Sequence, residues 1–442
     1  MLSVSSIKIT KHNLIIFVLL TYFSASAQQN SPFSRYGLGD VSPSQNIVNR
    51  AMGGVTSTYY DSGTTVNFSN PASYSAFKYR VTYDIGLSID SRTLKSANPL
   101  DKYNTANFSP SYVAIGIPLS KTKNFGMALG LRPISNVSYS IEERKRLPAD
   151  SVLYIYDGDG GLYQAFVGVG KKWGGLSLGL NTGFLFGRKE NKTSTIPIDS
   201  VQVYKSNSTS LTTFNSPFLH AGLQYEAPLN KSTLIRFGFS GSLSQKLKAK
   251  QDITRETFEY DFNGNPVVID SVYKTPEQSG TIKLPATYIA GIAISKSAES
   301  KGLRYEKGCI SLEYETTQWS AYRFYDQPDK LQNSWQLRAG AKLMPNPASN
   351  NYWNWVIYRT GFSYGKDAFF ADGKDLPTYT FSLGAGLPIR KHRSYDYQST
   401  IINTTFEIGK RGNNKNNITE NFFRFSLGFN LSDVWFIKRK YD

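Results

Sequence analysis

The side chains that could carry out chemistry in this 442-residue chain are few. Beyond the N-terminal apolar run only two histidines occur, His220 and His392, and Cys309 is the single cysteine. The spacing of His392 and Ser394 would place both side chains on one face of a strand, as a hydrolase in a membrane barrel requires. A basic turn explains this stretch better, because a nucleophile also needs a base that a third group orients. This inventory excludes metal sites built from His and Cys, and we expect no enzyme activity, metal or cofactor.

A second chemical pattern is the tripeptide Asp-Ser-Val, whose serines are Ser151, Ser200 and Ser271. It resembles the O-glycosylation sequon that Bacteroidetes use on exported proteins. Residues of three similar hairpins would explain the repetition equally well. If the serines are modified, the sugars mark these segments as exposed polar surface.

The N-terminus has the order of a secretory signal peptide. Lys8 and Lys11 precede the apolar run 14–23, and small residues follow up to Ala27. A ten-residue run is too short for a helical span of roughly 20 residues. We therefore predict a signal peptide over residues 1–27, cleaved after Ala27.

The composition after residue 27 favours a membrane barrel. No apolar stretch reaches the length of a helical span, whereas aromatic residues make up 14% of the chain and glycine occurs 36 times. Aromatic side chains suit membrane interfaces and glycines suit crowded, curved strands. The formal net charge of +17 is better explained in an exported chain by anionic lipid head groups or acidic partners than by nucleic acid. Lysines and arginines that simply occupy loops and lumen remain an alternative.

Apolar residues recur at every second position in several segments, which is the period of a strand. A membrane strand alternates an apolar residue facing lipid with a small or polar residue facing the lumen over about ten residues. Near the C-terminus, Arg424 and Gly428 are placed in the lumen by this pattern. Apolar alternation is clearest in four sets: Phe423, Phe425, Leu427, Phe429 and Leu431; Phe381, Leu383, Ala385, Leu387 and Ile389; Leu176, Leu178, Leu180, Phe184 and Phe186; Phe125, Met127, Leu129 and Leu131.

The spacing of such segments predicts an all-β fold, a transmembrane antiparallel β-barrel of about 14 strands over residues 78–442. The strand starts lie near residues 78, 108, 124, 160, 174, 211, 232, 281, 307, 333, 353, 377, 399 and 420. Polar insertions at 191–210, 251–280 and 318–332 are interpreted as long loops or hairpins beyond the membrane.

Residues 28–77 do not follow the strand pattern. They are polar, yet apolar groups such as Phe33, Met52, Phe68 and Tyr74 are spaced along them and could pack inside a lumen. We predict an N-terminal plug, or hatch, over residues 28–77. The alternative for this composition is a disordered tail.

These residues resemble the FadL-type long-chain fatty acid transporters of the bacterial outer membrane. Asn70, Pro71 and Ala72 look like the Asn-Pro-Ala plug signature of that family, and Gly53 and Gly54 look like its plug glycines. The opening at residues 34–40 resembles Bacteroidetes barrels of the same superfamily, which includes OMPP1, FadL and PorV-like proteins. The resemblance implies a fourteen-stranded outer-membrane barrel with a hatch.

The C-terminus carries a candidate signal for membrane insertion. Trp435 and Phe436 resemble the terminal aromatic residues that the barrel-insertion machinery recognises. The basic residues 438–440 beyond them depart from barrels that end at that aromatic. The sequence predicts that this machinery is one partner, with outer-membrane lipid and lipopolysaccharide as others.

Two main functions are compatible with these features. The resemblance implies passive transport of hydrophobic small molecules across the outer membrane, which requires an apolar cavity behind Asn70–Ala72 and a lateral gap in one strand. The alternative is a non-transporting accessory barrel in a membrane protein complex for outer-membrane protein assembly or protein secretion. Surface adhesion through the loops is a third hypothesis.

Overall fold

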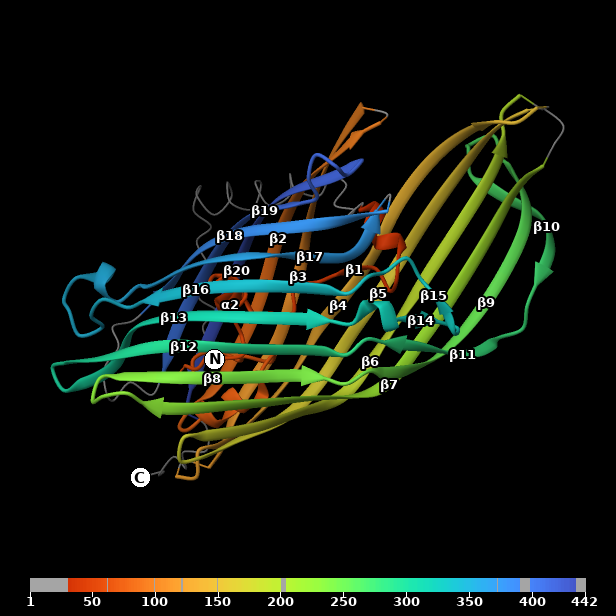
Figure 1. The fold of residues 1–442 in the computed structure, drawn as a ribbon. Coiled ribbons are helices and arrows are strands. Elements are labelled where there is room, and N and C mark those ends of the chain that lie inside the picture. The colour runs from red at the N-terminus through yellow and green to blue at the C-terminus, as the bar shows by residue number, and fades with distance from the viewer. Residues whose placement is uncertain are drawn as a thin grey trace, which may run out of the picture.

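The computed structural model describes residues 31–61, 63–98, 100–120, 122–148, 150–199, 204–371, 373–389 and 398–434. Within these ranges, fourteen antiparallel strands pair in a closed ring, and β20 pairs back with β2. The ring runs β2-β3-β4-β5-β6-β7-β8-β12-β13-β16-β17-β18-β19-β20. This confirms the predicted closed barrel and its strand number (Figure 1).

The ring strands are β2 (Val81–Ala97), β3 (Leu100–Ser120), β4 (Phe125–Arg146), β5 (Ser151–Trp173), β6 (Leu176–Pro197), β7 (Lys205–Pro228), β8 (Thr233–Ser242), β12 (Thr287–Ser300), β13 (Leu303–Thr317), β16 (Ser334–Leu343), β17 (Ile357–Ala371), β18 (Lys374–Pro388), β19 (Ser399–Arg411) and β20 (Ile418–Asp433). Outside the ring lie β9 (Gln245–Tyr260), β10 (Pro266–Lys274), β11 (Gln278–Leu284), β14 (Arg323–Phe324), β15 (Gln327–Pro328) and the short helices η3 (Trp319–Ala321) and η4 (Tyr352–Asn354).

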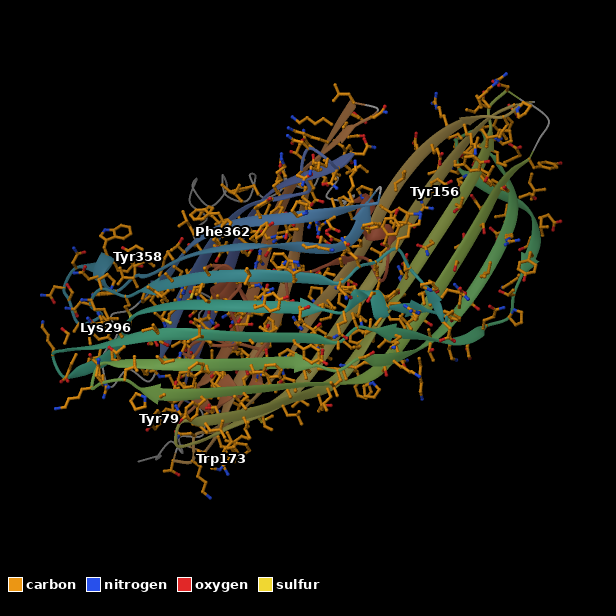
Figure 2. All side chains as sticks on the ribbon, viewed as in Figure 1. Tyr79, Tyr156, Trp173, Lys296, Tyr358 and Phe362 are labelled. Carbon is orange, nitrogen blue, oxygen red and sulfur yellow. The ribbon has the colours of Figure 1, made fainter. Side chains whose placement is uncertain are left out.

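Side chains alternate between the two faces of the wall as the period of two requires. Predicted lipid-facing residues such as Leu180, Phe184, Phe381 and Phe423 are exposed, whereas Arg424 lies inside. Aromatic side chains gather where the outward apolar band ends, at Tyr79, Trp173 and Tyr358 near one end of the barrel (Figure 2).

Four neighbouring strands are much longer than a membrane span requires. The strands β4 to β7 have 22, 23, 22 and 24 residues, against about ten for a tilted membrane strand. The parts of these strands beyond the membrane length extend the sheet past the rest of the barrel. The strand β9 joins this extension by pairing with the first half of β7. The segments predicted as long loops or hairpins at 191–210 and 251–280 therefore contain hairpin strands. A strand that lies in water can have polar side chains on both faces. Its sequence then shows no alternation of apolar and polar residues, so the pattern does not reveal the strand.

Residues 31–61 and 63–77, called the plug segment below, contact the inner face of the ring, and residues 78–80 lead into β2. The plug segment forms η1 (Pro32–Arg35), β1 (Asp40–Val41), α2 (Ile47–Arg50) and η2 (Pro71–Ala76). Nearly all side chains from Gln45 to Tyr59 are buried. No helix within the described ranges is long and apolar enough to cross a membrane.

Candidate functional site: plug segment, cavity and lateral gap

The Asn-Pro-Ala motif forms the start of η2. The Asn70 side chain accepts a hydrogen bond from the Ala72 amide at 3.1 Å and donates one to the Ser57 carbonyl at 2.7 Å. Proline at the first helical position loses no hydrogen bond, because that amide has no partner within a helix. The motif thus caps a buried turn and joins it to another part of the plug segment, which explains these residue types.

Gly53 and Gly54 both have positive φ angles, +68° and +86°, a conformation that glycine adopts without steric cost. The Gly53 amide donates to Ser382 Oγ on β18 at 3.0 Å. A side chain at Gly53 would also collide with the backbone of β16 and β17. The structure therefore places these two predicted residues at a close contact between plug segment and wall.

The wall presents glycines to the plug segment on twelve of the fourteen ring strands. A Cβ atom on eleven of them would approach the plug segment to less than 3.0 Å, and on Gly428 to 3.4 Å. Glycine is required wherever another backbone approaches so closely. The twelve are Gly86, Gly116, Gly126, Gly170, Gly179, Gly222, Gly238, Gly291, Gly340, Gly361, Gly384 and Gly428, and we call them the glycine belt.

The two strands without a belt glycine, β13 and β19, hold the plug segment through carboxylates. Glu313 on β13 accepts hydrogen bonds from the backbone amides of Thr56, at 2.8 Å, and Ser57. Glu407 on β19 forms a buried ion pair with Arg50 of α2. Every ring strand thus contacts the plug segment.

Further ion pairs join β1 to the wall. Asp40 lies 2.7 Å from Arg92 on β2 and 2.9 Å from Arg411 on β19, and Arg92 also contacts Glu420 at 2.9 Å. Burial by itself would raise the pKa of the Asp40 carboxyl, but Arg411 and Arg92 outweigh it and lower the pKa to about 2. Burial of a charge is costly unless it is paired, and this network supplies the partners.

One cavity of about 420 Å³ lies beside the plug segment within the ring. Its lining mixes apolar residues with charged ones: Arg50, Arg92, Arg132, Arg338, Arg411 and Arg424, and Asp40, Asp367, Glu315, Glu407 and Glu420. Asn70, Pro71 and Ala72 are absent from that lining and pack against Gly170, Gly179 and Gly222. The apolar cavity that the transport hypothesis requires behind the motif therefore stays a prediction, and the cavity of about 420 Å³ does not lie against the motif.

The wall has a lateral gap between β3 and β4. These strands pair only from Val113 to Ser120 against Phe125 to Leu131, although each continues further (Figure 1). Pro110 on β3 and Pro133 on β4 stand just beyond the last pair. Proline cannot donate to a ladder and occurs at strand edges, so the two prolines explain where the pairing ends. The transport hypothesis predicts a lateral gap in one strand, whereas this opening lies between two strands that each continue.

The plug segment borders the β4 side of this gap. Asp40 and Val41 pair with Asn136 and Ser135, and the Ser31 amide donates to the Ser138 carbonyl at 3.2 Å. Val41 remains exposed at 46%. The first residues of the plug segment therefore pair with the part of β4 that β3 leaves unpaired.

An exposed apolar hairpin lies outside the ring. All nine residues of β10 are exposed, and β10 pairs only with β9 among the described strands. Its apolar side chains include Val267, Val268, Ile269 and Val272. Exposed apolar clusters on a soluble part of a protein mark interaction sites.

Of the remaining predicted residues that the structure describes, Ser151 and Ser271 lie away from this site. Ser151 lies at the start of β5 and bonds Arg146 at 2.7 Å, and Ser271 lies on exposed β10. Ser200, His392, Trp435 and Phe436 lie outside the described residues, as does the predicted signal peptide. His220 bonds the Ser69 carbonyl at 2.9 Å and serves packing of the plug segment.

Sequence reasoning missed most of the buried charges, although a signal for them exists. Glu313, Arg338 and Glu407 each stand between two outward apolar residues, and a charge at that parity must face the lumen. Their partners in the plug segment carry no comparable pattern.

Comparisons with known proteins agree with this architecture. The BamG family model matches residues 9–442. No curated protein matches the chain.

Among solved structures, the FadL homologue of Pseudomonas aeruginosa is 12% identical and has a TM-score of 0.53, over 90% of this chain and 100% of that one. The toluene transporter TbuX of Ralstonia pickettii is 13% identical with a TM-score of 0.52, over 89% and 98%. The toluene transporter TodX of P. putida is 12% identical with a TM-score of 0.53, over 89% and 99%. The chain therefore shares the barrel fold of these channels.

Proposed function

This chain belongs to the BamG family, and from that premise we propose that it is an accessory barrel of a complex that assembles or secretes outer-membrane proteins. In this proposal it resides in the bacterial outer membrane, and its barrel is a scaffold, not a passage. The match to the BamG family model over residues 9–442 supports this role.

The observation that carries the proposal is the attachment of the plug segment to all fourteen ring strands. Opening a route along the barrel axis would separate the glycine belt from the plug backbone and break the ion pairs of Asp40 and Arg50. Breaking a buried pair by leaving one charge alone costs about 3–5 kcal/mol. A hydrophobic solute would also meet the six arginines of the cavity. Such a lumen suits a fixed plug better than a hydrophobic channel.

The exposed β10 hairpin supplies a surface for a partner protein. It lies on the wall that extends past the membrane-length parts of the strands, where lipid does not cover apolar side chains. Partner strands bind free strand edges through backbone hydrogen bonds, and β10 offers both a free edge and apolar side chains. We therefore place the partner contact at β10.

Co-purification from native membranes tests this function. We expect wild-type protein, extracted in mild detergent after crosslinking, to retain other outer-membrane proteins in stoichiometric amounts. The variant Val268→Asp/Val272→Asp should lose them, because two charges interrupt the apolar surface. The matched control is Leu100→Asp, since Leu100 is 90% exposed at the tip of a different hairpin. Recovery of wild type as a lone barrel contradicts the proposal.

Passive transport of a hydrophobic small molecule is the second candidate. It is supported by the lateral gap between β3 and β4 and by the fold shared with hydrocarbon channels. In that case a ligand enters the membrane sideways through the gap. A defined hydrophobic molecule bound to purified protein, with uptake lost on deletion, favours this candidate.

Two predicted sites complete the proposal. Trp435 and Phe436 act as the insertion signal for the barrel-insertion machinery. Ser151, Ser200 and Ser271 carry O-linked sugars. The intact mass of protein from its native host tests the latter, since three serine-to-alanine changes should remove any sugar mass.

A further inference from the structure

A second hollow lies on the outer face of the barrel, away from the plug segment. It has a volume of about 470 Å³ and spans β17, β18, β19, β20 and β2. Its floor is Ile408, which is 61% exposed, and phenylalanines stand on both sides of it. These side chains form one row across directly paired residues: Phe362, Phe381, Ile408, Phe423 and Ser91.

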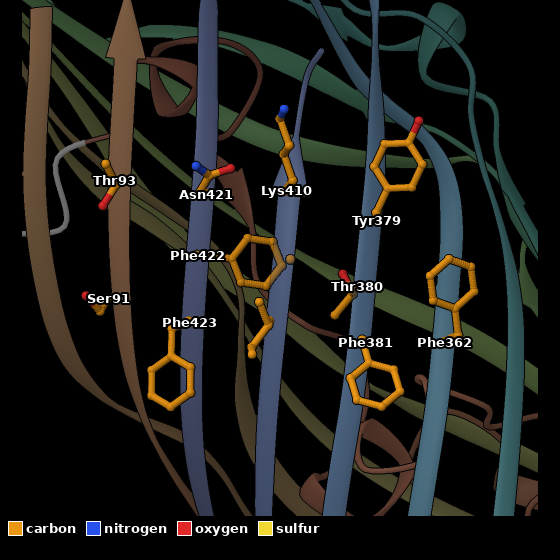
Figure 3. A pocket seen from close by; sticks show the side chains of 12 residues that line it. Ser91, Thr93, Phe362, Tyr379, Thr380, Phe381, Lys410, Asn421, Phe422 and Phe423 are labelled. Atoms are coloured by element: carbon orange, nitrogen blue, oxygen red, sulfur yellow. The ribbon is translucent and has the colours of Figure 1, made fainter.

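The next outward row, two residues further along each strand, changes to polar side chains. Tyr379 pairs with Lys410, Lys410 with Asn421, and Asn421 with Thr93. Figure 3 shows the Lys410 ammonium and the Tyr379 hydroxyl directed away from the phenylalanine rings. An apolar row followed at once by a polar row marks the boundary between acyl chains and head groups.

Two more lysines follow above this boundary on the same outward face. Lys95 on β2 and Lys102 on β3 are directly opposite each other and are exposed. Like charges in that position destabilise a sheet. Among the described residues, neither these two lysines nor Lys410 forms an ion pair. The repulsion between the two lysines therefore destabilises this hairpin, and a bound anion would remove that repulsion.

We propose that this face binds a membrane lipid with a phosphate head group. One acyl chain lies in the hollow over Ile408, between Phe381 and Phe423. The phosphate lies beyond it, where Lys410, Lys95 and Lys102 surround it. The side-chain amide of Asn421 offers a further hydrogen-bond donor for the phosphate, whereas the Thr93 hydroxyl already donates to Asn104 Oδ1 at 2.9 Å.

The arrangement of charge and apolar surface selects a lipid over a soluble anion or a protein partner. The apolar row lies in the band of outward side chains that includes Leu383 and Phe406 on the same strands, so acyl chains already surround it. The lysines lie on one side of that row, as a lipid head group requires. The site is independent of the accessory role proposed above.

Native mass spectrometry of the purified full-length protein tests the site. Phosphatidylglycerol and phosphatidylcholine with identical acyl chains are titrated separately against the protein in detergent. We expect phosphatidylglycerol to be retained more strongly. Lys95→Gln/Lys102→Gln/Lys410→Gln should remove this preference, with a loss of about fivefold in affinity per lysine.

Matched variants separate charge at this site from charge in general. Lys246→Gln/Lys248→Gln/Lys296→Gln removes three exposed lysines of β9 and β12 and should leave the preference intact. Ile408→Trp should fill the hollow and weaken binding of both lipids, whereas Leu180→Trp on outward β6 should not. Folding of each variant is checked by heat-dependent mobility in gels.

Three outcomes overturn the proposal. If wild type retains the two lipids equally, the lysines do not bind a phosphate head group. They then serve only to keep the unpaired edge of β3 from pairing with another strand. Unchanged preference in the first triple variant places the lipid elsewhere. Displacement of phosphatidylglycerol by millimolar inorganic phosphate means that the site binds soluble anions.

Discussion

The carboxylate of Asp40, in the short strand β1 of the plug segment, lies 2.7 Å from the guanidinium of Arg92 on β2. Both side chains are buried, and they are 52 residues apart in the chain. Arg411 completes the contact from β19 at 2.9 Å. This contact joins the segment that pairs with β4, on one side of the lateral gap, to β2 and β19 on the other side of the gap.

Replacing Asp40 by alanine should release the start of the plug segment. The change leaves Arg92 and Arg411 with fewer partners and should destabilise the seated segment by about 3 kcal/mol. Hydrogen exchange is expected to rise over residues 31–44 and to stay unchanged in α2. Asp199→Ala is the control, because its pair with Arg146 is exposed and such pairs contribute under about 1 kcal/mol. Equal exchange in both variants would show that Asp40 does not hold the segment.

Acid should loosen the same contact. The pKa of Asp40 is lowered from 3.8 to about 2 in the folded protein. A carboxyl whose pKa falls on folding stabilises the folded state above its unfolded pKa of about 4, and this contribution disappears as the pH falls toward 2. Cleavage of the plug segment by pepsin should increase between pH 4 and pH 2 in wild type. The increase should be smaller for Asp40→Asn, which has no carboxyl to titrate, and identical curves would refute the assignment.

The glycine belt should tolerate no side chain. Gly179→Ala places a Cβ atom against the backbone of Pro71, where nothing can yield without moving η2. Overpacking of this kind costs about 1–3 kcal/mol, so the temperature of unfolding in gel-mobility assays should fall. Gly308→Ala is the control, since its nearest neighbour is 3.3 Å away and φ is not positive. A Gly179→Ala protein as stable as the control would argue against tight seating of the plug segment.

A disulfide between plug segment and wall distinguishes the two candidate functions. Ser75 Oγ in η2 and Ser177 Oγ in β6 are 3.4 Å apart, close enough for a bridge. In a chain with Cys309→Ser, oxidised Ser75→Cys/Ser177→Cys should support assembly as well as wild type, because a scaffold needs no plug movement.

Loss of function on oxidation, with recovery on reduction, would favour transport instead. Ser75→Cys alone controls for the substitution. Growth and the amount of co-purifying partner proteins are the readouts.

Much of the barrel could be predicted from local pattern. Each of the fourteen predicted strands has a counterpart in the ring, although the starts near 108 and 160 fall inside β3 and β5 and the start near 281 falls in β11. The inward position of Arg424 and the outward position of Phe423 follow from the same alternation. A period of two constrains each strand separately, because it needs only the membrane on one side and the lumen on the other.

The plug contacts and the lateral gap depend on which strands become neighbours. Arg50 and Glu407 are 357 residues apart, and no local pattern relates them. The belt glycines were recognisable as small inward residues, but only the closed ring brings them around one segment. Likewise, Pro110 and Pro133 mark the edge of the gap only because β3 and β4 are neighbours in the ring. The sequence by itself determined the strands and their faces, whereas the tertiary structure decided the site, because register and ring closure join residues that local alternation leaves independent.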